Sequence, residues 1–284
     1  MVRAAAATAC TEYGHRARCC EVRAATRTGP VHVHPSGPGR IVAAHERRVH
    51  VSTPTPTPPE VPLRHRVRAR IERVRFHGSA DFWEERYAAG GNSGAGSYGE
   101  LAAYKAGVLN ELIARHQIAS VIEFGSGDGN QLTLASYPTY LGLDVSRTAI
   151  SMCAEKFAAD ETKSFIWYDP EHFVNHGAIT ADAALSLDVL LHLVEDGVFE
   201  RYLRQLFSAA TRYVIIFSSD TDAQTAPHVR HRRFTPWVQA NLAGWHLTQR
   251  IENPLARQAS TDTLADFYIY ELNPTTADAN GVLP

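Results

Sequence analysis

The sequence has few cysteines, no long apolar run and almost no net charge. Four cysteines in 284 residues are too few for a disulfide scaffold, so we expect a reducing compartment and a cytoplasmic protein. No apolar run approaches the roughly 20 residues of a membrane span, which excludes a membrane-spanning helix. The formal net charge of −2 argues against a protein that is basic throughout, such as one that coats DNA. A content of 44% hydrophobic residues is sufficient for a globular core.

The near-zero net charge hides a boundary near residue 75. Residues 1–75 hold 14 Arg, no Lys, 5 Glu and no Asp, a balance of +9. Residues 76–284 hold 14 Lys and Arg against 25 Asp and Glu, a balance of −11. The first part contains a single leucine, Leu63, and two isoleucines, so it has little to bury. We expect residues 1–75 to be a disordered tail rich in Arg, Pro, Thr and His, and residues 76–284 to form one domain.

The tail admits several interpretations. Its apolar start is too short for a secretory signal, and the proline run in 51–59 disfavours the amphipathic helix of an organelle transit peptide. The arginines could bind nucleic acid or another acidic partner. We favour a solvated tail without a dedicated role, one form of which is a start codon placed too far upstream. We expect no metal site, because paired C-x2-C spacing is absent around Cys10, Cys19, Cys20 and His15.

From residue 79 onward, short apolar runs alternate with helical patterns, and a glycine-rich loop occupies 90–97. The expected helices cover 79–87, 98–116, 147–159 and 199–209. The expected strands are 120–124, 139–143, 164–168, 183–187 and 213–217, followed by two tandem strands at 245–251 and 266–272. This alternation implies an α/β fold with a parallel sheet and helices on both faces, and the tandem strands imply an antiparallel hairpin at its end.

The strongest chemical signal is the segment Val121-Ile-Glu-Phe-Gly-Ser-Gly-Asp-Gly-Asn-Gln-Leu132. An apolar strand runs into Gly125, Gly127 and Gly129 and then, we expect, into a helix whose first N–H groups are unpaired. Such a turn lets a nucleotide approach the backbone closely. A dinucleotide fingerprint needs glycine at position 130, where this chain has Asn. Glu123 precedes the first glycine by two residues and suits a cationic ligand better than a pyrophosphate.

Acidic residues follow the next strands. Asp144 ends the second strand 19 residues after Gly125 and could accept both hydroxyls of a ribose. Asp169 ends the third strand and could accept an adenine amino group. Asp188 and His192 follow the fourth. Each acid alone could be a chance helix cap, but acids at successive strand ends favour a ligand site, because open α/β sheets bind ligands there.

These features resemble the class I S-adenosylmethionine-dependent methyltransferases over about residues 80–272. Glu123, Gly125, Gly127 and Gly129 match the hallmark E/D-x-G-x-G-x-G in full, and Asp144 and Asp169 match the ribose acid and the adenine contact. The resemblance implies a Rossmann-like, mostly parallel sheet of seven strands with an antiparallel last strand. It also implies S-adenosyl-L-methionine as cofactor, held by Glu123, Gly125, Gly127, Asp128, Gly129, Asp144, Val145, Asp169 and Leu187.

The same resemblance suggests where chemistry and acceptor binding take place. His192 would act as base or contact the acceptor, the alternative being a histidine that packs locally. Asp188 would contact cofactor or acceptor, the alternative being a helix N-cap. Loop 90–97 and segment 228–234 are similar to those of a bacterial subgroup whose acceptors are mostly unassigned.

Two further groups are candidates for the acceptor side. Loop 90–97 could be a lid over the cofactor rather than an exposed linker, with contacts from Tyr87, Asn92, Ser93 and Tyr98. A basic cluster could bind an anionic acceptor or be a solvated loop, and it comprises His228, Arg230, His231, Arg232 and Arg233.

The leading hypothesis is a methyltransferase that acts on O or N of a small-molecule or glycan-like acceptor, an anionic one if the basic cluster takes part. The fourth strand is not followed by an Asn-Pro-Pro-Tyr-type sequence, which in the family marks base methylation, so nucleic acid is disfavoured. The alternatives are a non-catalytic subunit that binds the cofactor and, less favoured, a nicotinamide-dependent oxidoreductase. The choice between O and N, and the oligomeric state, stay open.

We predict that a chain beginning at residue 76 folds and binds cofactor as tightly as the full chain does, because the first 75 residues have too few apolar side chains to contribute a core. Thermal unfolding and calorimetric titration of both chains test this. Lower solubility or weaker binding after truncation would show that the tail contributes.

Overall fold

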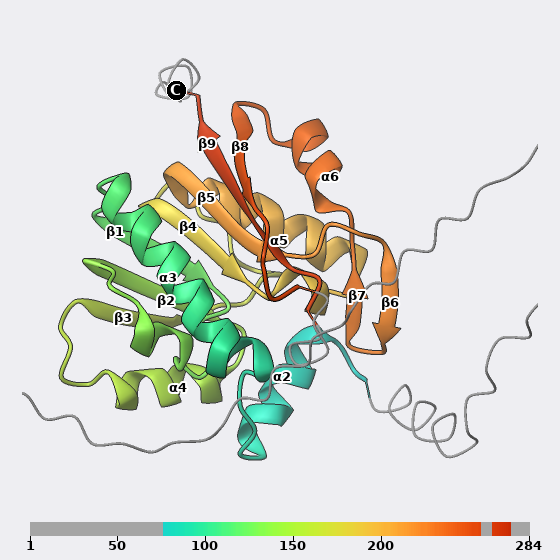
Figure 1. The fold of residues 1–284 in the computed structure, drawn as a ribbon. Coiled ribbons are helices and arrows are strands. Elements are labelled where there is room, and N and C mark those ends of the chain that lie inside the picture. The colour runs from blue at the N-terminus through green and yellow to red at the C-terminus, as the bar shows by residue number, and fades with distance from the viewer. Residues whose placement is uncertain (1–75, 257–262, 274–284) are drawn as a thin grey trace, which may run out of the picture. The chain divides into compact units, whose positions relative to one another are not determined.

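The computed structural model describes residues 76–256 and 263–273, so the predicted tail and its boundary lie outside the described residues. The described chain forms a seven-stranded sheet in the order β3-β2-β1-β4-β5-β9-β8 (Figure 1). Its strands are β1 (Ser120–Phe124), β2 (Thr139–Asp144), β3 (Lys163–Trp167), β4 (Ala181–Leu187), β5 (Ala210–Ser218), β8 (Trp245–Ile251) and β9 (Asp266–Leu272). The first five pair in parallel, and β9 is antiparallel to both β5 and β8. The expected fold class is confirmed.

Burial explains why the central strands read as continuous apolar runs. In β4, Ala183, Ala184 and Leu185 are fully buried, because both faces of the strand are covered. The edge strands differ, and β8 in particular is exposed along most of its length, with Leu247 45% exposed. The carboxyl-terminal residues of β1, β2, β4 and β5 are therefore buried in the core.

Helices cover both faces of the sheet. They are α2 (Ser79–Ala88), α3 (Gly99–Arg115), α4 (Arg147–Lys156), α5 (Asp196–Ser208) and α6 (Phe234–Asn241). One core cluster joins α3 to the β1 and β4 face, and a second joins α5 and α6 to the opposite face. None of the helices in the described ranges is long and apolar enough to cross a membrane.

The structure corrects two sequence-based expectations. The helix expected after Gly129 is a single 3-10 turn, η2 (Gln131–Leu134), since the chain is already extended at Ala135, and Pro138, which lacks an N–H, disfavours a return to helix. The segment that carries the basic cluster contains a short hairpin, β6 (Ala223–Ala226) and β7 (Val229–His231), which the sequence analysis treated as a loop. The other expected elements are present with ends shifted by up to three residues.

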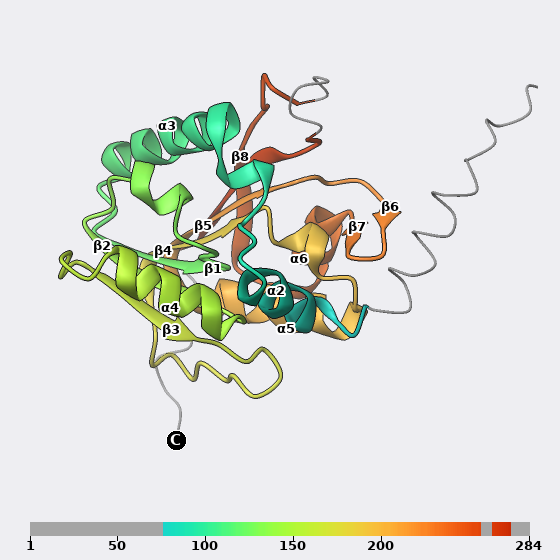
Figure 2. The same ribbon diagram turned by 90° about the horizontal axis from the view of Figure 1, so that it is seen from below.

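Helix α2 lies across the carboxyl edge of the sheet, between α4 and the β6–β7 hairpin (Figure 2). At its start, the Ser79 hydroxyl donates to Glu195 Oε2 over 2.6 Å. In its middle, Glu84 accepts hydrogen bonds from the hydroxyls of Ser146 and Thr148, each over 2.6 Å, at the first turn of α4. Two carboxylates therefore dock α2 at both sides of the site.

We predict that Leu185→Ala lowers the free energy of unfolding by roughly 2–5 kcal/mol, because it leaves a cavity in the fully buried centre of β4. The matched control, Leu247→Ala on the exposed edge strand, should cost less than about 1 kcal/mol. Denaturant unfolding of both variants measures the difference. Equal losses would contradict the assignment of β4 to the core.

Candidate functional site

A pocket of about 510 Å³ lies over the carboxyl ends of β1, β2, β4 and β5, in the size range of small-ligand sites. The strand order reverses between β1 and β4, which is where open α/β sheets place their ligands. Over β1 and β2 lies what we call the glycine-turn half, lined by Gly125, Ser126, Gly127, Asp144, Val145 and Tyr168. Toward β5 lies the hairpin half, lined by Phe82, Trp83, His192, Ser219, His228 and His231.

The turn after β1 requires glycine at two positions. Gly125 and Gly127 have φ values of +91° and +57°, which L side chains rarely adopt. A Cβ on Gly125 would lie 2.4 Å from Val189 Cγ2, and one on Gly127 would lie 2.3 Å from Ser93 Oγ. The backbone N–H of Gly125 donates to the Leu143 carbonyl at the end of β2 over 2.7 Å. Val189 and Ser93 thus pack so closely on the turn that neither glycine could carry a side chain.

Asp144 links this turn to β2. Its Oδ2 accepts the Gly127 N–H over 2.8 Å, and its Oδ1 accepts the Ser146 N–H over 2.9 Å. Burial raises the pKa of Asp144 to about 6, and the charge of Glu84 adds to the increase against these two hydrogen bonds. The result is a buried carboxylate, open to the pocket, that would be stabilised as an anion by further donors.

Glu123 lies deeper, with an exposure of 4%, and accepts the Tyr140 hydroxyl over 2.7 Å. Burial raises the pKa of Glu123 to about 7, although the Tyr140 hydrogen bond and the charge of Lys105 oppose the increase. The carboxyl group of Glu123, which also lines the pocket, is therefore partly protonated near neutral pH.

The residues predicted as a lid meet at the glycine turn. Asp128 Oδ2 accepts the Ser93 N–H over 3.0 Å and the Tyr98 hydroxyl over 2.7 Å, and the Asp128 N–H donates to Ser93 Oγ over 2.9 Å. Tyr87 contacts the same Ser93 hydroxyl at 3.0 Å. Asn92 shapes the loop instead, since its Oδ1 accepts the Gly94 N–H. Asp128, predicted to hold cofactor, is thus engaged in holding loop 90–97 down.

Asp188 has a buried partner, Lys105, that was not among the predicted site residues. The carboxylate pairs with Lys105 Nζ over 2.8 Å, and the Lys105 side chain is fully buried in α3. Asp188 has a φ of +59°, and a Cβ on Gly96 would lie only 2.7 Å from its Oδ2. A lysine on the apolar face of the helical pattern, in line with Leu101 and Leu109, was the available clue.

His192 is held at the opposite end of the pocket, in the turn η3 (Leu190–His192). Its Nδ1 lies 3.1 Å from the His228 carbonyl, and Trp83 meets its ring edge-on at a centroid distance of 4.8 Å. Burial lowers the pKa of His192 to about 4, so the ring is neutral at physiological pH.

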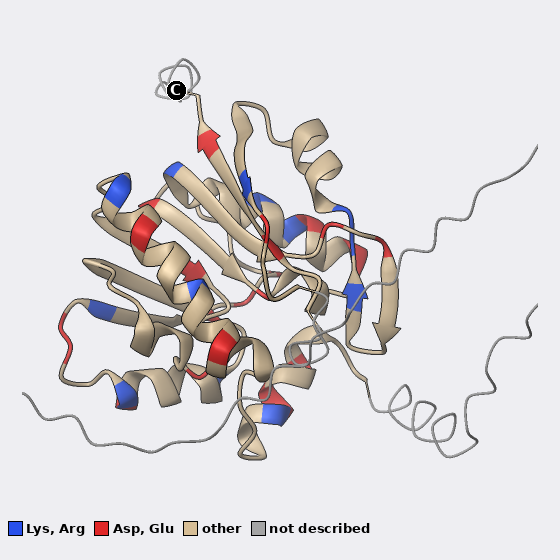
Figure 3. Ribbon diagram, in the orientation of Figure 1, with Lys and Arg blue, Asp and Glu red and all other residues tan. Residues whose placement is uncertain are grey.

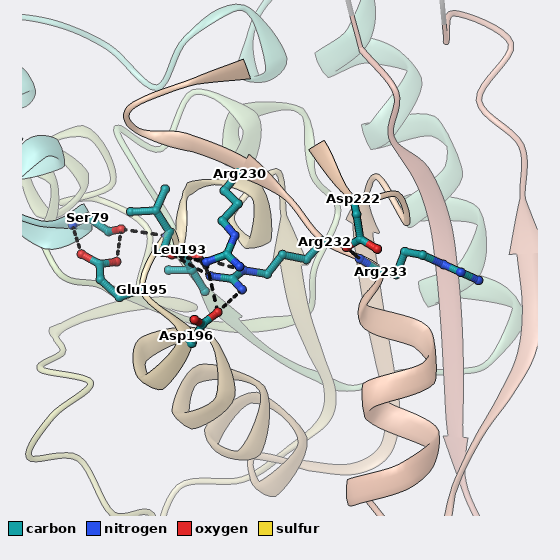
Figure 4. A network of polar contacts seen from close by, with 9 residues as sticks. Ser79, Leu193, Glu195, Asp196, Asp222, Arg230, Arg232 and Arg233 are labelled. Carbon is teal, nitrogen blue, oxygen red and sulfur yellow. Dashed lines mark hydrogen bonds and ion pairs between the residues drawn. The ribbon is translucent and has the colours of Figure 1, made fainter. Parts of the chain in front are cut away.

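The basic cluster does not act as one surface. Arg230 and Arg232 both pair with Asp196, the former over 3.1 Å, and Arg232 also donates to the Val194 carbonyl over 2.7 Å (Figure 4). The blue segment at β7 accordingly faces the red start of α5 (Figure 3). His231 lines the pocket, with its Nδ1 2.6 Å from Ser219 Oγ. Arg230 and Arg232 thus share one carboxylate, the exposed Arg233 side chain points away from it (Figure 4), and the two histidines line the pocket.

Four further residues were predicted to hold the cofactor, and only two of them lie at the pocket. Val145 and Leu187 line it. Asp169 turns away, since its carboxylate accepts the Glu171 N–H over 2.9 Å and pairs with His172 at 2.8 Å. Of the described residues around it, Tyr168 and Pro170 line the pocket and Asp169 does not. Gly129 packs against Phe157 below the turn.

No protein-family model matches the sequence, and no curated protein matches it either. Solved structures do match. Magnesium protoporphyrin IX methyltransferase from Synechocystis PCC 6803 with bound SAH is 15% identical, with a TM-score of 0.50, over 72% of this chain and 99% of that one. The N-methyltransferase NodS from Bradyrhizobium japonicum WM9 in complex with S-adenosyl-L-homocysteine is 14% identical, with a TM-score of 0.50, over 61% of this chain and 85% of that one. The chain has the class I methyltransferase fold.

In this methyltransferase fold, the Lys105–Asp188 pair supports the floor of the pocket. We predict that Asp188→Asn lowers the free energy of unfolding by roughly 3 kcal/mol, because it leaves the buried Lys105 ammonium without its counter-ion. The double variant Lys105→Met/Asp188→Asn should recover much of that loss, since no charge is then buried. Denaturant unfolding of the unaltered chain and the two variants tests this, and a double variant no more stable than Asp188→Asn would contradict a paired role.

Proposed function

We propose that the protein is an S-adenosylmethionine-dependent methyltransferase. The observation that carries the proposal is the Asp144 carboxylate, bonded to the Gly127 N–H over 2.8 Å at one end of a pocket that continues to His192. Two proteins with the same fold, described as methyltransferases, were both solved with S-adenosyl-L-homocysteine (SAH). Their low identity makes the geometry of this chain the main support.

The residues of the glycine-turn half fit this cofactor. Each Asp144 oxygen accepts one backbone N–H, and a carboxylate can accept about four hydrogen bonds, so it has capacity for the two hydroxyls of a ribose. Gly125 and Gly127 line the pocket, so the backbone of the turn would lie close to the ligand. Val145 and Leu187 provide apolar wall for the rest of the nucleoside. When bound, the cofactor would supply a methyl group activated by its sulfonium.

The protein would contribute position and shelter rather than activation. Helix α2 and loop 90–97 cover the carboxyl edge and would exclude water from the methyl group. His192 and Asp188 lie beyond the glycine turn and would contact a small-molecule or glycan-like acceptor at its reacting O or N. A covered pocket of about 510 Å³ supports a small acceptor over a macromolecule.

We predict micromolar binding of S-adenosylmethionine by calorimetry, and at least a roughly tenfold loss for Asp144→Asn, because the amide accepts fewer hydroxyl donors. The control is Asp160→Asn, at an exposed acid that pairs with Lys163. Unchanged binding in Asp144→Asn, or binding of NADH in place of S-adenosylmethionine, would overturn the proposal. Cofactor binding without turnover of any acceptor would indicate a non-catalytic subunit.

The same titration has an expected pH dependence. Ribose hydroxyls stabilise the ionised form of Asp144, whose pKa is raised to about 6 by burial in the free protein. The contribution of Asp144 to the affinity should therefore be constant well above pH 6 and fall as the pH drops through 6, apart from any effect of Glu123, whose pKa is raised to about 7. Asp144→Asn should remove this part of the dependence, whereas Asp160→Asn should keep it.

A further inference from the structure

The hairpin half of the pocket is built from segments that are far apart in the sequence. Phe82 and Trp83 come from α2, His192 follows β4, and His228 lies in the turn between β6 and β7. The Phe82 and His228 rings stack at a centroid distance of 4.3 Å, and the His192 and His228 rings are parallel within 4°. This half therefore presents aromatic and imidazole walls, and both aromatic side chains from α2 remain half-buried inside the pocket.

Cationic side chains are scarce in the lining of this half. Arg86 is the only Arg or Lys among the described residues that line the pocket; its guanidinium lies 5.7 Å from the centre of the Trp83 ring, and its Nε donates to the Asn92 carbonyl over 2.6 Å. Arg230 and Arg232, which the sequence offered as anion ligands, pair with Asp196. A carboxylate or phosphate on the acceptor would therefore find one guanidinium, already engaged by the Asn92 carbonyl, to offset its lost hydration.

The hairpin determines which nitrogen of His192 is free to accept. A backbone carbonyl can only accept, so the contact between His192 Nδ1 and the His228 carbonyl places the hydrogen on Nδ1. In the neutral ring Nε2 then carries a lone pair. Burial is the largest effect and lowers the pKa of His192 to about 4. The hydrogen bond to the His228 carbonyl and the charge of Asp188 act against this decrease, and the charges of His228 and His231 add to it.

We propose that the acceptor is an uncharged aromatic hydroxyl compound, whose ring lies against Phe82 and Trp83 and whose hydroxyl donates to Nε2 of His192. This inference rests on the proposed methyltransferase function and names its substrate class. Planar rings match aromatic walls, a hydroxyl matches a lone acceptor, and a lining with a single guanidinium that is already hydrogen-bonded disfavours acids.

The chemical step balances with the residues present. The acceptor oxygen forms the bond to the methyl carbon, and the methyl–sulfur bond breaks with its electron pair remaining on sulfur. The hydroxyl proton moves to Nε2 of His192, which later releases it to water. A weakly basic imidazole suffices, because the hydroxyl oxygen becomes strongly acidic as the new bond forms.

The test uses three matched probes: 1-naphthol, 1-naphthoate and naphthalene. Each is titrated calorimetrically into the full chain, with and without saturating S-adenosylhomocysteine. We expect 1-naphthol to bind about tenfold more tightly than either of the others. In His192→Phe, which keeps a ring against Trp83 but lacks Nε2, naphthol should lose its advantage over naphthalene. Phe82→Ala should weaken both, and His246→Ala, on the edge strand β8, should change neither.

Turnover supplies the second measurement. With saturating S-adenosylmethionine, 1-methoxynaphthalene should form, and its rate should fall at least about 100-fold in His192→Phe and in His192→Ala, with cofactor affinity unchanged. His192→Phe and His192→Ala are both used so that the conclusion does not depend on one variant that fails to fold. Thermal unfolding of each variant shows whether it is folded.

The outcomes separate the two proposals. Four results would overturn the acceptor assignment alone. Two concern binding to the unaltered protein: naphthoate binds more tightly than naphthol, or naphthol does not bind. The other two are a preference for naphthol that survives in both His192 variants, and bound naphthol that is not methylated although the cofactor binds. Failure of the cofactor and its product to bind would overturn the methyltransferase proposal, while the naphthol titrations without them would still decide the acceptor site.

Discussion

A carboxylate that is removed from water must find donors or a counter-ion, and three such groups lie at the carboxyl ends of β1, β2 and β4: Glu123 and Asp144 are buried, and Asp188 is 20% exposed. Glu123 takes the Tyr140 hydroxyl, Asp144 takes two backbone N–H groups, and Asp188 takes Lys105. Each partner comes from a different segment. Satisfying these carboxylates therefore draws the glycine turn, β2 and α3 together, and the pocket is the space that they enclose.

The two halves of that pocket differ in what holds them. The glycine-turn half depends on backbone groups, which leave little freedom in the geometry at Gly125 and Gly127. The hairpin half depends on side chains carried by α2 and the β6–β7 hairpin, elements added to the parallel sheet rather than part of it. A shared fold can therefore keep the first half and vary the second, which is how one architecture hosts many acceptors.

The sequence predicted the parallel sheet, the tandem strands and the convergence of Gly125, Gly127, Asp144 and His192 well, because strand ends and glycine turns are local signals. It failed where tertiary contacts decide. The grouping of basic residues at 228–233 read as an anion site, but Asp196 lies 36 residues away from Arg232 and neutralises it only in the folded chain. The buried Lys105 was missed for the same reason, since its burial is set by the packing of distant segments.

Helix α2 touches both halves at once. Glu84 accepts hydrogen bonds from Ser146 and Thr148 at the first turn of α4, whereas Phe82, two residues earlier, stacks on His228. A ligand that shifted α2 in one half would therefore also move the walls of the other. Any change of affinity that arose in this way would have the same factor in both directions, because linkage between two binding sites is reciprocal.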